Sequence, residues 1–195
     1  MDNLTIDIYN KNATRYANLN IDKVSLKAYC DFSNALPISG HVLDYGCGPG
    51  YFAKQFLADG FKVDAFDASE KMIEIASREA QINWSVTDFK SFRATTQYDG
   101  IWANFSLLHA PKREINSLVQ TIFNSLKPRG LFSLGLKLGT GERRDKMGRK
   151  YSYFEEKEIR SILSKEGFRY SSHHLGKAIG LDGENANFII ILSHA

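Results

Sequence analysis

Asp44 stands two residues before the first of three glycines, Gly46, Gly48 and Gly50, which come at every second position. Apolar residues precede Asp44 and a helical pattern follows Gly50, so a strand, a tight turn and a helix are expected. Such turns usually bind phosphate, but Tyr51 stands where the dinucleotide pattern G-x-G-x-x-G has its third glycine. At ~4 Å and an effective dielectric near 20, Asp44 would also repel a pyrophosphate by about 4 kcal/mol. The turn therefore favours a ligand with a positive centre.

Two further acids end the next two strand patterns of the chain. Asp67 follows Gly50 by 17 residues, and a carboxylate there can accept hydrogen bonds from both hydroxyls of a ribose. Asp88 can accept from an exocyclic amino group, and the backbone N–H of Phe89 can donate to a ring nitrogen. A cation, a ribose and an adenine together describe S-adenosylmethionine better than they describe a dinucleotide.

Alternating strand and helix patterns predict the elements that position these residues. Strands are expected at 41–46, 61–67, 82–89, 98–106, 131–139, 168–176 and 187–195, and helices at 22–35, 50–60, 69–80, 111–130 and 155–168. Residues 1–20 show no clear period and suggest a flexible arm or a lid, and residues 140–153 read as a charged loop.

This order predicts an α/β fold, a doubly wound Rossmann-like seven-stranded sheet that is mostly parallel. The last strand is expected to be antiparallel, because no helix separates it from the strand before it. Residues 1–195 are interpreted as a single domain, in which residues 1–36 form an arm and a helix over the cofactor site.

The composition excludes several classes of protein. Two cysteines cannot build a disulfide framework or a cysteine-rich zinc site, and no metal site is expected. A net charge of +3 is low for a nucleic-acid binder, so nucleic acid is an unfavoured partner. The absence of a signal peptide and of an apolar run of roughly 20 residues indicates a cytoplasmic protein without membrane contact. The oligomeric state is left open.

Four stretches of the chain resemble motifs of the class I S-adenosylmethionine-dependent methyltransferases. They are VLDYGCGPGYFA, VDAFDASEKMIEIA, TDF and YDGIWANFSLLHAP. The resemblance covers about residues 40–170 and is strongest to the small stand-alone group similar to ubiquinone-biosynthesis-type and tellurite-resistance-type enzymes. It implies an enzyme that uses S-adenosyl-L-methionine and leaves S-adenosyl-L-homocysteine.

The resemblance also implies roles for individual residues around that cofactor. At the methionyl part, Gly46, Gly48 and Gly50 would let the cofactor approach, Asp44 would orient its amino-acid end, and Asn104 would border this group and the acceptor. Asp67 would hold the ribose. Ala68 and Met72 would flank the adenine, and Asp88 and Phe89 would contact its edge. Purely structural roles stay open as alternatives for some of these residues. Met72 suits the core equally well, Asp88 can cap the next segment, and Cys47 suits a packed loop.

The methyl acceptor is expected to be a small molecule, because no recognition domain and no strongly basic face accompany the motifs. His109 follows the fourth strand pattern and is the candidate base, with a structural histidine as the alternative. A start-of-helix dipole would keep it neutral.

Cations crowd residues 137–153, beginning with Lys137, and suggest a lid in which Arg144 or Arg149 contacts an acidic acceptor. Tyr9 or Tyr16 of the arm is expected to cover the site.

The alternatives to a small-molecule methyltransferase are an RNA or protein methyltransferase and a non-catalytic S-adenosylmethionine-binding regulator or subunit.

Overall fold

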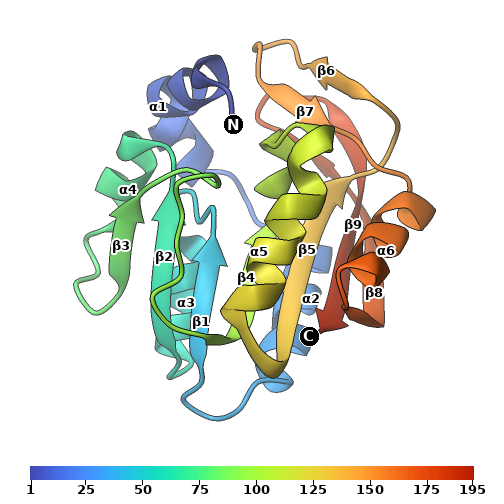
Figure 1. Ribbon diagram of the computed structural model, residues 1–195. Coiled ribbons are helices and arrows are strands. Elements are labelled where there is room, and N and C mark those ends of the chain that lie inside the picture. The colour runs from blue at the N-terminus through green and yellow to red at the C-terminus, as the bar shows by residue number, and fades with distance from the viewer.

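The computed structural model describes all residues from 1 to 195 and contains one large sheet with helices on both faces (Figure 1). Its strands are β1 (His41–Tyr45), β2 (Lys62–Asp67), β3 (Asn83–Val86), β4 (Tyr98–Asn104), β5 (Leu126–Lys137), β8 (Arg169–Ile179) and β9 (Asn185–His194). The helices are α1 (Asn3–Ala17), α2 (Lys23–Asn34), α3 (Tyr51–Ala58), α4 (Glu70–Ala76), α5 (Ile115–Ser125) and α6 (Glu156–Lys165), with short 3-10 turns at Leu107–His109 and Lys112–Glu114.

The seven strands lie in the order β3-β2-β1-β4-β5-β9-β8. Neighbouring strands from β3 to β5 are parallel, whereas β9 runs antiparallel to both β5 and β8. The expected fold class is therefore confirmed, including the reversed last strand. The chain moves outward from β1 to β3 and then crosses back to β4, so the switch point lies between β1 and β4, where ligands bind in open α/β sheets.

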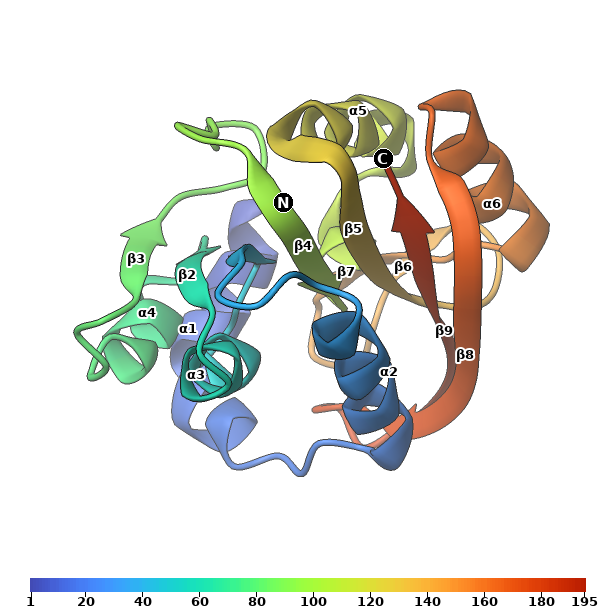
Figure 2. The ribbon, with the colours of Figure 1, turned by 90° about the horizontal axis from the view of Figure 1, so that it is seen from below.

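Two hydrophobic clusters hold the helices against the sheet. Helices α5 and α6 pack on one face, and α2 and α3 pack on the other (Figure 2). Trp102 of β4 is fully buried in the second cluster, where it contacts aromatic rings of α2 and α3. None of the helices combines the length and the apolar character that crossing a bilayer requires.

Residues 1–20, expected as a flexible arm or a lid, are mostly helix α1, which the sequence did not predict, so the flexible arm was wrong. Asp2 caps the helix by accepting the Thr5 N–H at 3.3 Å. Its apolar face is sparse, because Thr5, Ile8 and Ala13 are the buried positions. Such a weak stripe gives little helical periodicity in the sequence.

Two other boundaries differ from the sequence prediction. The charged loop 140–153 contains a small hairpin of β6 (Glu142–Arg144) and β7 (Lys150–Ser152). The helix expected at 111–130 ends at Ser125, and β5 begins at once. Arg129, with a φ of 66°, turns this extended segment, and its N–H donates to the Ala195 carbonyl oxygen at 3.1 Å. Leu126 pairs with Tyr98 of β4, so local helical spacing gave way to strand pairing.

The glycine turn between β1 and α3 depends on backbone angles that other residues avoid. Gly46 has a φ of 81°, and a Cβ atom built there would lie 2.4 Å from the Cβ of Ser106. The N–H groups of Gly46 and Cys47 both donate to the carbonyl oxygen of Phe66, at 3.0 and 2.9 Å. The turn is therefore fixed to the end of β2 and packed against the segment after β4.

We predict that Gly46→Ala lowers the free energy of unfolding by about 3 kcal/mol, because left-handed strain adds to overpacking against Ser106. Gly60→Ala is the matched control, since Gly60 has a φ of 90° but nothing within 4 Å of an added Cβ. That control is expected to lose only the strain, about 1–2 kcal/mol. Urea denaturation measures both losses, and equal losses would contradict the close packing at Gly46.

Candidate functional site

A cavity of about 610 Å³ opens at the carboxyl ends of the central strands. This volume lies within the range of small-molecule sites. Figure 1 shows α1 beside the carboxyl ends of β1 and β2, and residues of α1 and of the β8–β9 turn line the cavity together with the strand ends. Of the residues that the sequence suggested, the lining includes Asp44, Gly46, Gly48, Asp67, Ala68, Met72, Phe89, Asn104, His109 and Arg149.

Asp44 is a buried carboxyl group with no cation beside it. Its side chain is 3% exposed, and its Oδ2 atom has no hydrogen-bond partner. Burial raises the pKa of Asp44 to about 8, and the nearby charge of Asp67 acts in the same direction. An unsatisfied buried acid is costly, and a cationic group in the cavity would remove that cost.

Asp67 is oriented by the backbone on both sides of it. Its Oδ2 accepts the Gly48 N–H at 2.9 Å and its Oδ1 accepts the Ser69 N–H at 2.8 Å. The Ser69 hydroxyl in turn donates to Asn10 of α1 at 2.6 Å. Burial raises the pKa of Asp67, and these N–H groups counteract it. The second acid is thus held in place by backbone N–H groups at the wall of the cavity.

Gly50, Asp88 and Arg144 are not among the residues that line the cavity. Gly50 begins α3 and packs against Trp84, whose ring lies 2.6 Å from where a Cβ would stand. Asp88 accepts the N–H groups of Lys90 and Ser91 at 3.1 and 2.8 Å and so caps the turn after β3. Only its neighbour Phe89, which is buried, reaches the cavity.

Arg144 lies on the surface of β6, away from the cavity. Its guanidinium donates to the Gly148 carbonyl oxygen at 2.6 Å and to Asp2 at 3.1 Å. It therefore joins the start of α1 to the β6–β7 hairpin. Its guanidinium group does not line the cavity in which an acceptor would lie.

His109 is 4% exposed and has partners at both ring nitrogens. Nδ1 lies 2.7 Å from the Lys150 carbonyl oxygen, and Nε2 lies 2.7 Å from the Tyr9 hydroxyl. Because a carbonyl oxygen only accepts, Nδ1 carries the proton and Nε2 accepts from Tyr9. Burial lowers the pKa of His109 to about 3, so the ring is neutral. Burial, and not the helix dipole that we expected, is the main cause.

Arg149 is buried to 1% exposure and its charge is already neutralised within the protein. Its Nη2 lies 2.6 Å from Asp145, and its Nε donates to the same carboxylate at 2.8 Å. Its Nη1 donates to the Tyr9 hydroxyl at 3.1 Å. Tyr9 therefore joins Arg149 to His109, and with them it fastens α1 over the cavity.

Several residues that line the cavity were given only as alternatives in the sequence prediction, or had no predicted role. Tyr9 and Tyr16 of α1 both line the cavity, with their rings 5.5 Å apart. Lys137 lines it from the last position of β5, and Ile179 and Phe188 line it from β8 and β9. Lys137 had a usable signal, because it ends a predicted parallel strand on the ligand side of the sheet. Ile179 and Phe188 had no such signal in the sequence, because their positions depend on how far the β8–β9 hairpin extends over the cavity.

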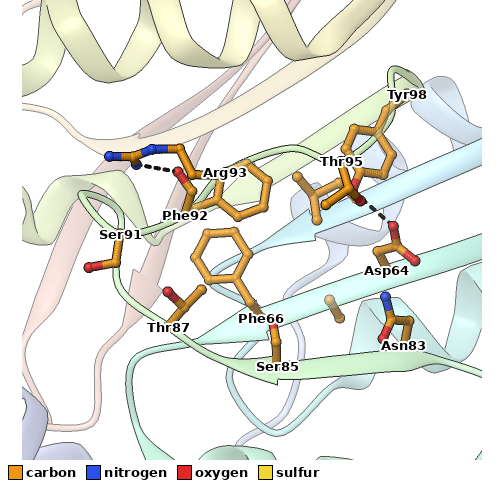
Figure 3. Close-up of a pocket in the computed structure, with 12 residues that line it drawn as sticks. Asp64, Phe66, Asn83, Ser85, Thr87, Ser91, Phe92, Arg93, Thr95 and Tyr98 are labelled. Carbon is orange, nitrogen blue, oxygen red and sulfur yellow. Dashed lines mark hydrogen bonds between the residues drawn. The ribbon is translucent and has the colours of Figure 1, made fainter.

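A second hollow of about 300 Å³ lies over β2 and β3, beneath residues 91–98 (Figure 3). Some of its polar side chains bond to other groups of the protein. The Tyr98 hydroxyl donates to Asp64 at 2.8 Å, and Arg93 donates to the Phe92 carbonyl oxygen at 2.7 Å. None of the residues that the sequence suggested lines this hollow.

Comparison with known proteins agrees with the motifs. A family model described as a methyltransferase domain matches residues 42–130. The malonyl-[acyl-carrier protein] O-methyltransferase of Enterobacter lignolyticus is 30% identical over 94 residues, which cover 47% of this chain and 37% of that protein. The trans-aconitate 2-methyltransferase of Variovorax paradoxus is 34% identical over 104 residues, which cover 51% of this chain and 39% of that protein. These matches thus span well under half the length of either relative.

Solved structures extend the likeness to the whole fold. The 1,6-didemethyltoxoflavin-N1-methyltransferase of Burkholderia thailandensis, solved with S-adenosylhomocysteine, has a TM-score of 0.78 at 18% identity and covers 98% of this chain and 87% of its own. TehB from Haemophilus influenzae has a TM-score of 0.74 at 15% identity and covers 96% of this chain and 66% of its own. Residues 42–130 therefore match a methyltransferase-domain model, and the whole chain has the fold seen in solved S-adenosylmethionine-dependent methyltransferases.

Proposed function

We propose that this protein transfers the methyl group of S-adenosylmethionine to a small-molecule acceptor. One observation carries the proposal: a buried carboxyl without a partner, Asp44, lies in the same cavity as the oriented carboxylate of Asp67. The first suits the ammonium group at the cofactor's amino-acid end, and the second suits a ribose diol. The matched family model and the relatives support the same activity.

The residues present fit this cofactor. The orphaned Oδ2 of Asp44 can accept from an ammonium group, and the glycine turn admits a ligand close to its backbone. Met72 and Phe89 offer apolar walls for an adenine. When bound, the cofactor supplies an activated methyl group on a sulfonium. The chain's own task is then to hold the acceptor in line and to exclude water.

Enclosure of the cavity favours a small acceptor over a polymer. Tyr9, held by His109 and Arg149, closes one side through α1. Arg15 of α1 donates to the Leu181 carbonyl oxygen at 2.9 Å and joins the arm to the β8–β9 turn. With both ring nitrogens of His109 engaged, we assign it to positioning Tyr9 and not to accepting the acceptor's proton directly. Two relatives named for malonyl-[acyl-carrier protein] and trans-aconitate support an acidic acceptor.

We predict that Asp67→Asn weakens S-adenosylhomocysteine binding at least tenfold, because charge-assisted hydrogen bonds contribute about 1.5–3 kcal/mol each. Asp7→Asn is the control, since it removes the same charge from an exposed position of α1. Isothermal titration calorimetry of wild type and both variants gives the three affinities, and melting curves check that Asp67→Asn is folded. Failure of the wild type to bind the cofactor or its product would refute the proposed function.

We also predict that binding S-adenosylhomocysteine at pH 6.5 releases close to one proton from Asp44. Because folding raises its pKa from about 4 to about 8, this acid is protonated in the free protein at pH 6.5. Its effect on stability is a loss that grows as the pH rises from about 4 towards 8. The ligand's ammonium group favours the ionised form and lowers the pKa again.

Calorimetry in buffers of different ionisation enthalpy counts the released protons directly. Asp44→Asn is expected to bind more weakly and to release none. Equal proton release by wild type and Asp44→Asn would show that Asp44 does not face the charged end of the ligand.

A further inference from the structure

Residues from opposite sides of β4 divide the cavity into two parts. Asp44 and Asp67, assigned above to the cofactor, come from β1 and β2 on one side. On the other side, β5, β9 and β8 follow in order across the sheet and contribute Lys137, Phe188 and Ile179. The second part is therefore where an acceptor would lie.

This second part is mainly apolar. Phe105 follows β4, and its ring lies edge-on to that of Phe188 at 5.0 Å. Ile179 and Leu181, at the end of β8 and in the turn after it, line the cavity near them. An acceptor that is wholly polar would find few partners on these walls, whereas an apolar body would be well accommodated.

Two basic side chains line the cavity, and they differ in their partners. Arg149 is neutralised by Asp145, as described above. Lys137 has no carboxylate within ion-pair distance and no hydrogen-bond partner for its Nζ atom, which lies 3.9 Å from the centroid of the Tyr151 ring. The ring positions the ammonium group without neutralising it.

The environment of Lys137 makes its free charge costly. The residue is half-buried, and burial lowers the pKa of its ammonium group, with Arg149 acting in the same direction. Asp145 and Asp182 oppose this from a distance without pairing with it. A half-buried cation next to apolar walls favours an anionic group that can approach it directly.

We propose that Lys137 is the counter-ion of the acceptor, which has an apolar body and one anionic group. The body would pack on Phe105, Ile179 and Phe188, and the anion would sit at the Nζ atom of Lys137. This assigns to Lys137 the role that the sequence suggested for Arg144 or Arg149, whose cations are committed to other contacts. The proposal rests on the proposed function, because it takes the other half of the cavity to be the cofactor's.

The test uses two matched probes, 1-naphthoate and the neutral 1-naphthamide, which share an aromatic body and differ in charge. Their affinities are measured by calorimetry on the full chain, with and without saturating S-adenosylhomocysteine. The variants are Lys137→Met, which keeps the length of the side chain, and Lys137→Arg, which keeps its charge. Lys146→Met is the control, because Lys146 is exposed and paired with Glu184.

Wild type is expected to bind naphthoate at least tenfold more tightly than naphthamide. Lys137→Met is expected to lose this preference, while Lys137→Arg and Lys146→Met keep most of it. Equal binding of both probes by wild type, no binding of either, or an unchanged preference in Lys137→Met would overturn the proposal. If Lys137→Met does not fold, Lys137→Gln replaces it under the same criteria.

The two proposals fail separately in this experiment. If S-adenosylhomocysteine binds and the naphthoate preference is absent, the role of Lys137 is wrong and the proposed function stands. If S-adenosylhomocysteine does not bind but the preference depends on Lys137, the anion site stands and the proposed function is wrong.

Discussion

The carboxyl group of Asp44 lies near the carboxyl end of β1, where it is shielded from water and has one oxygen without a hydrogen bond. A protein tolerates such a group only where another gain offsets its cost, and the proposed cofactor's ammonium group would provide that gain. The turn after Asp44 is closely packed, because a side chain at position 46 would overlap Ser106. The parallel pairing of β1 with β2 then brings this acid close to Asp67, which the turn itself orients through Gly48.

The hydroxyl of Tyr9 is the point at which helix α1 joins two other segments over the site. Tyr9 donates to His109 and accepts from Arg149, and these two residues come from the segment after β4 and from β6–β7. Asp145 neutralises Arg149, and the Lys150 carbonyl fixes the tautomer of His109. Three segments far apart in the sequence are thereby joined at one point, while the ammonium group of Lys137 lines the cavity without a carboxylate partner.

Much of this architecture could be predicted from the sequence, because strand and helix periods and glycine spacing are local signals. The seven-stranded sheet, its reversed strand and the methyltransferase motifs were all confirmed. Helix α1 was missed because its buried face is carried by Thr5, Ile8 and Ala13, a weak stripe. The start of β5 at Leu126 was missed because its pairing with Tyr98 of β4 overrides local helical spacing.

At the site, local sequence patterns predicted which residues line the cavity better than they predicted the hydrogen-bond and ion-pair partners of these residues. No spacing rule shows that Asp145 pairs with Arg149, or that His109 has both nitrogens occupied. These contacts join distant segments, so they depend on the packed tertiary structure and not on any short motif.

The most direct test is a crystal structure of the protein grown with S-adenosylhomocysteine. The account predicts the ligand's ammonium group at Asp44, its ribose hydroxyls at Asp67 and its sulfur toward the side of the cavity that holds Lys137. Ligand density in the hollow over β2 and β3, or a ribose placed away from Asp67, would contradict it.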